Sequence, residues 1–239
     1  MTLPYTIQIP VYNETRALEF SALYFDRLGL SVRYVLDSQR TDEAETTLRR
    51  LGREPVYFLN ERPYIENGYE NFAALSPTDW ILRLDCDEVP SRELIRASIE
   101  FVERNGAGIA GFDRHQVLFR DGRLLTATTD RFRPSAQRQW RLFNRQQVRF
   151  NRQIHSPGLH LDHAVEQQPD AVIYHLSWVF LSLEERVKKA ARYDANGQSP
   201  VNRLNQLFPI ESTDFADLHA PFLQEIFSTW SIYENPVLI

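Results

Sequence analysis

The stretch Trp80-Ile81-Leu82-Arg83-Leu84-Asp85-Cys86-Asp87-Glu88 is a mostly apolar run that stops at three acids. A buried strand followed by clustered carboxylates places negative charge where a sheet opens to solvent. If the strand continues, Asp85 and Asp87 lie on one face, because side chains alternate along a strand. Two convergent carboxylates repel each other unless a cation joins them, and hard oxygen ligands suit Mg²⁺ or Mn²⁺. The stretch therefore predicts a divalent-metal site at the end of a strand.

Expected strands alternate with expected helices over the first half of the chain. The strands are Tyr5–Ile9, Val32–Leu36, Val56–Leu59 and Trp80–Leu84. The helices are Ala17–Leu28, Thr41–Leu51, Asn67–Leu75 and one that Ser91 caps and that reaches about Arg104. This alternation favours an α/β fold with a parallel, doubly wound sheet, in which ligands bind beyond the carboxyl ends of the strands. Asp37, Asp85 and Asp87 all follow expected strands, so we expect them at one edge of the sheet.

The second half of the chain shows shorter strands joined by polar turns. We expect these strands at Ile109–Phe112, Gln116–Phe119, Arg141–Phe143 and Ala171–Tyr174. Ser182 and Glu185 form a capping box for a helix that reaches about Asn196. After Pro200 the periodicity is weak, and residues 201–239 give no structural prediction. No repeat, low-complexity tract or clear linker interrupts the sequence, which favours a single domain over residues 1–239.

The composition limits the setting of the protein. Its 239 residues carry a formal net charge of -5, which argues against a general nucleic-acid-binding surface. The single cysteine, Cys86, excludes a disulfide framework and is typical of a reducing cytoplasm. We find no apolar run long enough to span a bilayer. Positive charge is concentrated between Arg131 and Arg152, where seven arginines and no acid occur, and the planar guanidinium suits phosphate.

Four stretches of the chain form an ordered set of motifs. They are Ile9–Glu14, Val35–Ser38 with Thr41-Asp42, Leu84–Glu88, and Arg141–Phe143 through Ile154-His155 with Val172–His175. Together they resemble the family 2 glycosyltransferases of the GT-A fold, and among these the bacterial enzymes that decorate lipopolysaccharide or related glycans. The stretch Leu84–Glu88 is similar to the Asp-x-Asp motif of that family. The resemblance covers residues 5–195, and the order and spacing of the motifs carry it.

The resemblance implies a GT-A-type, Rossmann-like fold with a mostly parallel sheet flanked by helices and a smaller mixed sheet in the second half. Residues 1–113 would form a nucleotide-binding half, residues 114–200 an acceptor-binding half, and residues 201–239 a tail. The implied activity is an inverting transfer, dependent on Mn²⁺ or Mg²⁺, from a nucleotide-sugar to a saccharide or glycolipid, as in polysaccharide biosynthesis. A UDP-sugar is the favoured donor, with GDP- and dTDP-sugars as alternatives. We expect no nucleic-acid partner and a cytoplasmic location, with peripheral association at the inner face of the membrane left open.

The resemblance also implies roles for individual residues. Asp37 would contact the base or ribose of the nucleotide, and Asp85 would lie near the ribose and the metal. Asp87 would ligate the metal on the diphosphate, and His175 would complete the metal site. For His175, a histidine packed in the core is an equally good interpretation of the sequence. The other substrate-binding residues expected are Pro10, Tyr12, Asn13, Glu14, Arg83, Arg138 and Arg141.

The catalytic base is where the sequence departs from the family pattern. Inversion needs a group that takes the proton of the acceptor hydroxyl on the opposite side of the sugar. Similar enzymes often have His-Glu where this chain has His155-Ser156, so the usual carboxylate is missing. We expect His155 and Asp130 as catalytic residues, with Asp113 and Asp162 as further candidates. A histidine that only ties a loop to the backbone is the alternative for His155.

A phosphatase of the haloacid dehalogenase type is the main rival enzyme. Its Asp-x-Asp-x-Thr/Val signature fits Asp85–Val89, with Asp85 as nucleophile and Asp87 as acid/base. That signature normally follows the first strand of its fold, whereas three strands are expected before it here. The partner lysine would also have to be Lys188 or Lys189, both in an expected amphipathic helix.

A polyanion-binding module is the rival outside the enzymes. The arginines between Arg131 and Arg152 are interleaved with aromatic residues, as platforms for stacking bases would require. These aromatics are Phe132, Trp140, Phe143 and Phe150. The net negative charge and the acid cluster argue against this interpretation.

Overall fold

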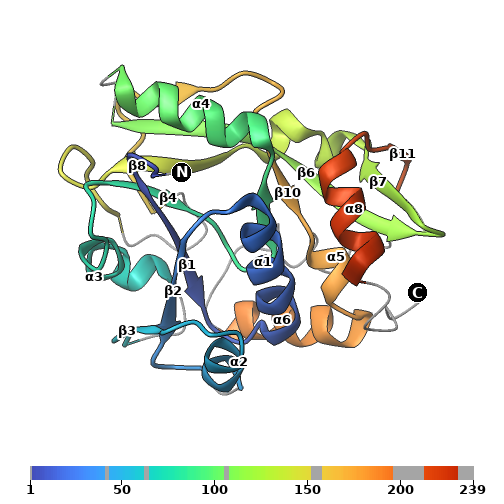
Figure 1. The fold of residues 1–239 in the computed structure, drawn as a ribbon, viewed down its shortest axis with the longest axis horizontal. Coiled ribbons are helices and arrows are strands. Elements are labelled where there is room, and N and C mark those ends of the chain that lie inside the picture. Colours follow the sequence, from blue (N-terminus) through green and yellow to red (C-terminus); the bar gives the residue numbers. More distant parts are fainter. Residues whose placement is uncertain are drawn as a thin grey trace.

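The computed structural model describes residues 2–40, 43–61, 65–104, 108–151, 158–195 and 213–230 (Figure 1). Their strands are β1 Thr6–Val11, β2 Val32–Asp37, β3 Val56–Phe58, β4 Trp80–Arg83, β5 Glu88–Pro90, β6 Ile109–Arg120, β7 Arg123–Ala127, β8 Gln139–Asn144, β9 Val165–Glu166, β10 Val172–His175 and β11 Phe215–Asp217. Their α-helices are α1 Thr15–Leu28, α2 Ala44–Arg50, α3 Tyr69–Ala74, α4 Arg92–Glu103, α5 Ser177–Phe180, α6 Leu183–Ala195 and α8 Pro221–Trp230. The short 3-10 turns are η1 Ile65–Gly68, η2 Asp130–Phe132 and η3 Pro134–Gln137.

An 11-stranded sheet runs through the described residues, and its main path has the order β11-β7-β6-β8-β4-β1-β2-β3. β1 pairs in parallel with β2 on one side and with β4 on the other, and β3 extends the parallel part beyond β2. β8 joins β4 in the antiparallel direction, and β6 and β7 continue from it. Helices cover this sheet (Figure 1). The predicted α/β fold with a mostly parallel sheet is confirmed, and the carboxyl ends of β2 and β4 lie at one edge.

The second half adds the smaller mixed arrangement that was expected, with one correction. Ile109–Phe112 and Gln116–Phe119 were expected as two strands, but they form one strand, β6. The polar residues between them stay extended because β10 pairs with them in parallel, with Val172 opposite Asp113 and His175 opposite Gln116. β10 also pairs antiparallel with β5. Strands from both predicted halves therefore share one sheet, and the division into halves stays a prediction.

The chain turns where the carboxylates cluster, and this corrects the expectation that the strand continues. β4 ends at Arg83, and the turn closes when the Glu88 amide donates to the Asp85 carbonyl oxygen at 3.0 Å. The Glu88 carboxylate in return accepts from the Asp85 amide at 3.1 Å. Local carboxylate-to-amide bonds of this kind stabilise turns. Asp85 and Asp87 therefore do not share a strand face.

The two predicted helix caps, at Ser91 and at Ser182, are present in the structure. Ser91 caps α4, because its hydroxyl oxygen accepts from the Leu94 amide at 3.0 Å. The capping box at the start of α6 is present in both directions. The Ser182 amide donates to the Glu185 carboxylate at 2.7 Å, and the Glu185 amide donates to the Ser182 hydroxyl at 3.3 Å. Gly29 ends α1 in the left-handed conformation, with φ of 66°.

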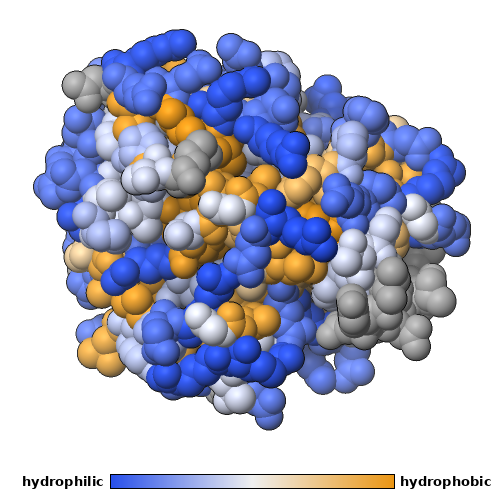
Figure 2. Space-filling model, in the orientation of Figure 1, coloured by the Kyte–Doolittle hydropathy of each residue, from blue (hydrophilic) through white to orange (hydrophobic). Residues whose placement is uncertain are grey.

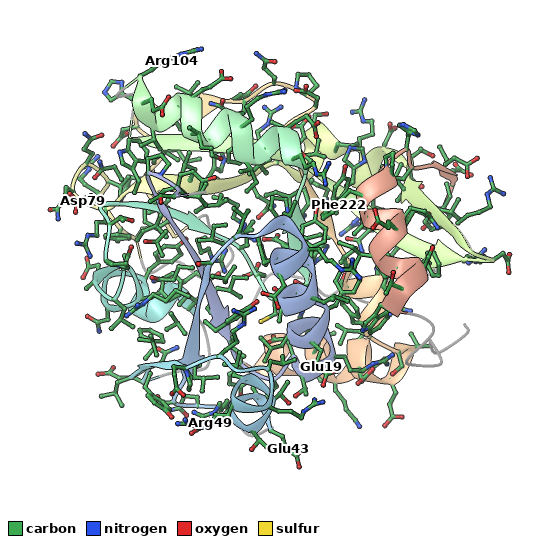
Figure 3. The ribbon with its side chains drawn as sticks, in the orientation of Figure 1. Glu19, Glu43, Arg49, Asp79, Arg104 and Phe222 are labelled. Atoms are coloured by element: carbon green, nitrogen blue, oxygen red, sulfur yellow. The ribbon has the colours of Figure 1, made fainter. Side chains whose placement is uncertain are left out.

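Helix α8 lies within residues 201–239, for which we made no structural prediction. Its apolar face packs against α1, where the Phe227 ring stacks on Phe20 with centroids 4.5 Å apart. Trp230 meets the same Phe20 ring edge-on at 5.5 Å. Phe222, labelled in Figure 3, lies edge-on to Tyr24 at 5.3 Å. Residues 221–230 therefore belong to the core, since α8 covers aromatic surface that α1 would otherwise expose.

On the face drawn in Figure 2, hydrophilic residues follow the outline and hydrophobic residues gather nearer the middle. None of the described helices is both long enough and apolar enough to span a bilayer.

Candidate active site

Asp37 ends β2 and forms the first part of the site. Its carboxylate is 7% exposed and accepts from the Gln39 amide at 2.7 Å and from the Asn60 side-chain amide at 2.9 Å. Burial raises the pKa of Asp37, while the bonds from Asn60 and Gln39 oppose that rise. The carboxylate is thus held in one orientation at the carboxyl edge of the sheet, where a ligand of this fold class binds.

Asn60 is a site residue that the sequence analysis missed. It follows β3 and binds the loop after β2 through both its backbone and its side chain. The Asn60 amide donates to the Ser38 hydroxyl at 2.9 Å, and its carbonyl accepts from the Gln39 side chain at 2.9 Å. Asn60 could have been predicted from its position directly after the third expected strand, because that strand ends at the same edge of the sheet as the strand before Asp37.

The Asp85 carboxylate lies between two arginines. Oδ1 accepts from Arg83 at 2.6 Å, and Oδ2 accepts from Arg141 on β8 at 2.6 Å. Both guanidinium groups are nearly buried, with side chains 9% and 6% exposed, while the Asp85 side chain is 36% exposed. Positive charge therefore balances Asp85 without a metal, and the substrate-binding role of Arg83 and Arg141 stays a prediction. The role of Asp85 as a metal ligand stays a prediction.

Glu88 is the acid of the motif to which the sequence analysis assigned no role. Its side chain is fully buried, and its Oε1 lies 2.7 Å from Arg141 and 3.3 Å from Arg114 on β6. Burial and the nearby Asp85 charge raise the pKa of Glu88 to about 8, against the pull of Arg114. Glu88 thus joins β5, β6 and β8 beneath the turn and fixes the arginine that holds Asp85.

Asp87 and His175 come together as predicted, from the turn after β4 and from the end of β10. The His175 Nε2 atom lies 3.4 Å from Asp87 Oδ2, and Lys189 of α6 approaches the same oxygen at 3.8 Å. Burial opposes the ionised form of Asp87, yet its pKa lies well below the usual range, because His175 and Lys189 lie beside the carboxylate. The resemblance to glycosyltransferases implied no role for Lys189, which the sequence analysis considered only for the phosphatase alternative.

Gln116 determines which nitrogen of His175 faces the carboxylate. The Gln116 Oε1 atom lies 2.6 Å from His175 Nδ1, and its Nε2 atom donates to Ser177 at 3.1 Å. Burial and the charge of Arg114 lower the pKa of His175, while the Asp87 carboxylate opposes them. With Nδ1–H donating to Gln116, the lone pair of Nε2 points to the side of Asp87.

These two side chains fit a divalent cation. The His175 Nε2 and Asp87 Oδ2 atoms lie 3.4 Å apart, and with Nε2 deprotonated they are a donor pair that suits Mn²⁺. Gln116 has the place of the outer-shell acceptor that commonly orients a ligating histidine. Among the residues described, no group of three or more His, Cys, Asp or Glu side chains gathers as a metal site. A bound cation would therefore need further oxygens from substrate or water.

The end of β1 borders the motif turn. The thiol of Cys86 is 3.5 Å from the carbonyl oxygen of Pro10, which lies in β1 and not in the bend that follows it. Tyr12 and Asn13 lie in that bend, where the Tyr12 amide donates to the Glu14 carboxylate at 2.9 Å. Of the residues predicted to bind substrate here, Pro10 thus lies beside the turn that carries Asp85 and Asp87.

Two other predicted residues have contacts elsewhere. Arg138 pairs with Asp113 on β6 at 2.7 Å and with Glu166 on β9, and neither partner is one of the aspartates at the strand ends. Asp130 lies on η2 with its side chain 94% exposed and 3.5 Å from Arg133. His155 lies outside the described residues.

The arginine-rich stretch does not form an open basic surface in the described part of the chain. Five of its arginines pair with acids, namely Arg133, Arg138, Arg141, Arg145 and Arg149. Two of the four expected stacking platforms, Phe132 and Phe143, are buried in the core. This arrangement disfavours the polyanion-binding alternative, since five of the arginines are paired with acids and two of the aromatic rings are buried.

Comparison with known proteins gives a match in structure and none in sequence. No known family matches the sequence, and no curated protein matches it significantly. Glucosyl-3-phosphoglycerate synthase from Mycobacterium tuberculosis, solved with Mn²⁺, UDP and phosphoglyceric acid, superposes with a TM-score of 0.50 and 14% identity over 90% of this chain and 87% of that one. Its complex with Mn²⁺, UDP and glucosyl-3-phosphoglycerate gives 0.50 and 15% identity with the same coverage. S. aureus TarS, residues 1–349, gives 0.47 and 11% identity over 95% of this chain and 73% of that one.

The chain has the fold of a GT-A glycosyltransferase. At this identity the likeness establishes the fold alone. It also bears on the phosphatase alternative, because the aspartate motif follows the fourth strand of a GT-A-type sheet. The lysine argument against the phosphatase is weaker than the sequence suggested, since Lys189 does approach Asp87. The position of the motif in the fold is the argument that remains.

Proposed function

We propose that this protein is a metal-dependent, inverting family 2 glycosyltransferase that moves a sugar from a nucleotide-sugar to a saccharide or glycolipid. One observation carries the proposal. Asp37 at the end of β2, and Asp87 with His175 beyond the end of β4, stand at the carboxyl edge of a GT-A-type sheet. The solved neighbours of this fold include an enzyme bound to Mn²⁺ and UDP.

Asp37 would bind the nucleoside end of the donor. Its carboxylate is fixed by Asn60 and Gln39, so it meets a ribose or base without first losing side-chain freedom. A UDP-sugar is the donor we favour, and GDP- and dTDP-sugars are the alternatives. Pro10 at the end of β1, and Tyr12 and Asn13 in the bend after it, would border the same end of the donor.

Asp87 and His175 would hold Mn²⁺, with Mg²⁺ as the alternative. A bound divalent cation supplies charge neutralisation of the leaving diphosphate. The protein's own part is to keep Asp87 ionised beside Lys189 and to keep His175 neutral with Nδ1 on Gln116. Lys189 also brings a positive charge to the place where the diphosphate would lie.

Arg83 and Arg141 would keep Asp85 in place and add positive charge behind it. Both lie within 2.6 Å of its two oxygens, and their Nε atoms are buried without a partner in the described residues. The guanidinium groups thus have donor capacity that Asp85 does not use. In this role Asp85 faces the ribose, and metal ligation by Asp85 is the alternative.

The base would be His155 or Asp130, as the sequence predicts. The other two candidates are each paired with an arginine, Asp113 with Arg138 and Asp162 with Arg149. The hydrogen bond and charge of Arg149 lower the pKa of Asp162, which makes that carboxylate a weaker base. The setting that goes with this activity is the cytoplasm, at or near the inner face of the membrane, in polysaccharide biosynthesis.

A donor panel tests the proposal. The protein is incubated with UDP-, GDP-, dTDP- and CMP-sugars in Mn²⁺, and release of nucleoside diphosphate is measured. Asp87→Asn should lower the rate on the order of 100-fold, as when one group that stabilises developing charge is lost. Asp217→Asn is the matched control, because that carboxylate is exposed and pairs with Arg123 on the surface. Undiminished activity of Asp87→Asn, or turnover of p-nitrophenyl phosphate without any nucleotide-sugar, would overturn the proposal.

A further inference from the structure

Arg114 is an arginine beside the motif turn to which the sequence analysis gave no role. It falls between the expected strands Ile109–Phe112 and Gln116–Phe119, outside the arginine-rich stretch of the second half. In the structure it lies within β6, because β10 pairs with this part of the strand. The sheet therefore carries a cation two residues before Gln116, the residue that contacts His175.

The Arg114 side chain leans toward the end of β10 that carries His175. In the sheet, Arg114 is opposite Ile173 of β10. Its guanidinium nonetheless meets Glu88 of β5 at 3.3 Å, and Glu88 is opposite His175, two residues and about 7 Å further along β10. Burial lowers the pKa of His175 and the charge of Arg114 lowers it further, as expected for a guanidinium close to the imidazole.

Two side chains orient the Arg114 guanidinium and leave part of it unpaired. Nη1 donates to Glu88 at 3.3 Å, and Nη2 donates to the Gln137 side-chain oxygen at 2.7 Å. A guanidinium has five N–H groups, and these two bonds use two of them. Within the described residues the other three have no partner. Arg114 thus offers hydrogen-bond donors in an orientation that the fold has already set.

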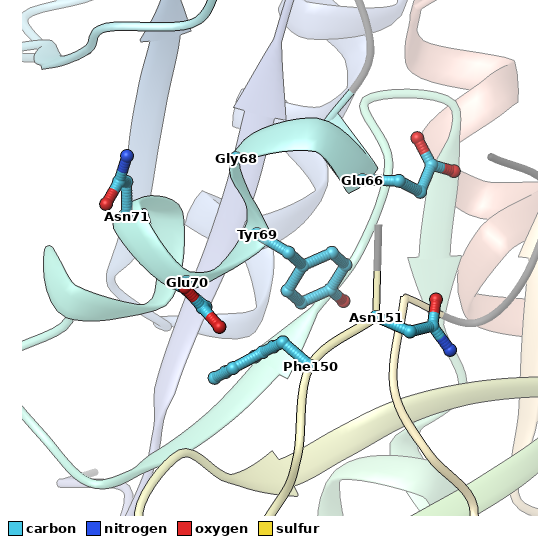
Figure 4. Close-up of a pocket in the computed structure, with 7 residues that line it drawn as sticks. All are labelled: Glu66, Gly68, Tyr69, Glu70, Asn71, Phe150 and Asn151. Atoms are coloured by element: carbon cyan, nitrogen blue, oxygen red, sulfur yellow. The ribbon is translucent and has the colours of Figure 1, made fainter. Parts of the chain in front are cut away.

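The other two arginines at the motif turn are less able to meet a ligand. Arg83 and Arg141 both bind Asp85 at 2.6 Å, and their Nε atoms are buried. Arg83 also lies against the Tyr69 ring, which Figure 4 shows, at 5.7 Å from the ring centroid. The side chains of Arg83 and Arg141 are 9% and 6% exposed, whereas that of Arg114 is 16% exposed. Of the three, Arg114 is the one that a ligand at the surface of the site can reach most directly.

We propose that Arg114 binds the diphosphate of the donor nucleotide, on the side of the site where Asp87 and His175 meet. The inference rests on the proposed function and adds a substrate-binding residue to it. A guanidinium donates paired N–H bonds to phosphate oxygens, and these bonds are stronger than those between neutral groups. Glu88 and Gln137 would hold the guanidinium in place without using all of its donors.

The same contact would stabilise the leaving group during transfer. The acceptor oxygen forms a bond to the anomeric carbon and gives its proton to the base. The bond from that carbon to the diphosphate breaks, and its electron pair stays on the phosphate oxygen. Negative charge therefore grows where Arg114 donates, and a donor that is already in place stabilises it without first reorienting.

Calorimetric titration of the whole chain with UDP, uridine and pyrophosphate in Mn²⁺ tests this inference. Arg114→Gln should weaken the binding of UDP and of pyrophosphate about 10-fold, since a charged hydrogen bond is lost. Uridine should bind Arg114→Gln as it binds the wild type, because it has no phosphate. Arg114→Lys keeps the charge but not the planar fork, so its affinity for UDP should be intermediate.

Arg120→Gln is the matched control. Arg120 is on the same strand and the same face as Arg114, but it lies about 20 Å further along, at the exposed end of β6. This variant should bind all three probes as the wild type does. Thermal melting shows whether each variant is folded. If Arg114→Gln does not fold, Arg114→Lys decides, because it keeps a positive charge beside Glu88.

The outcomes separate the inference from the proposed function. If UDP binds the wild type and Arg114→Gln equally well, the inference fails and the proposed function stands. An equal loss of UDP and uridine affinity would also overturn the inference, since it would indicate a general disturbance of the site. If pyrophosphate binding depends on Arg114 but UDP binds no more tightly than pyrophosphate, the proposed function fails and the anion-binding role of Arg114 stands. Both fail if the wild type binds neither.

Discussion

Gln116→Leu is predicted to weaken the metal site without removing any ligand. Gln116 is 5% exposed, and its Oε1 atom lies 2.6 Å from His175 Nδ1. Leucine has a similar volume, but it leaves the buried Nδ1–H without an acceptor. Loss of an outer-shell partner typically lowers metal affinity about 10- to 100-fold, which corresponds to about 1.4–2.7 kcal/mol. The neutral imidazole would also be free to move its proton to Nε2, where that proton blocks the lone pair next to Asp87.

Mn²⁺ binding in the presence of saturating UDP measures this effect by calorimetry. Gln116→Glu should restore binding, because a carboxylate accepts the same hydrogen bond. Gln8→Leu is the control for losing a buried glutamine, since Gln8 is 0% exposed and donates to the Phe72 carbonyl oxygen at 2.6 Å, away from His175. Gln8→Leu should lower the melting temperature but leave Mn²⁺ affinity alone. An unchanged Mn²⁺ affinity in Gln116→Leu would refute the reasoning.

Four further results are expected from the structure. Phe227→Ala should lower the free energy of unfolding by about 3–5 kcal/mol in urea titrations, and the half-buried Phe222→Ala by less. Ser91→Ala should lower the free energy of unfolding by about 1 kcal/mol. A loss no larger than that caused by replacing an exposed serine with alanine would contradict the capping role of Ser91. Burial lowers the pKa of His115, so the unfolded chain binds the proton more readily than the folded chain does. The free energy of unfolding should therefore fall as the pH drops below about 6.5. His115→Gln should reduce this dependence of stability on pH, as measured by thermal melting at several pH values. EDTA should shift the melting temperature little, because Arg83, Arg141 and Lys189 already balance the motif acids, and unfolding by EDTA would contradict this.

The parts of the fold that were predictable are those that local patterns specify. The four strands of the parallel sheet are apolar runs, and acids stand at the ends of two of them, β2 and β4, so Asp37 and the motif could be placed at one edge from the sequence. The caps at Ser91 and Ser182 depend on residues three positions apart, and both are present. In these cases the physical signal lies within a few residues of the feature it predicts.

The parts that were missed depend on partners far along the chain. β5 is three residues long and includes a proline, and it is a strand only because β10 pairs with it. β6 continues through Asp113-Arg114-His115 for the same reason. Helix α8 follows a stretch of weak periodicity, and its place is determined by the aromatic residues of α1. Gln116 and Asn60 carry no motif of their own, so only the sheet order shows what they touch.

The spacing of Asp85 and Asp87 in the sequence did not predict that the two carboxylates face different partners. Neighbouring carboxylates repel each other unless a cation lies between them, and in proteins a divalent metal commonly has this role. The turn instead separates the pair: Asp85 faces two arginines, and Asp87 faces His175 and Lys189. Each carboxylate is balanced by protein cations, so the fold does not depend on a metal, and the metal role can rest on Asp87 and His175. Under the proposed function, Asp85 is then available to contact the ribose. The order of the strands alone could not have predicted this division of roles between Asp85 and Asp87.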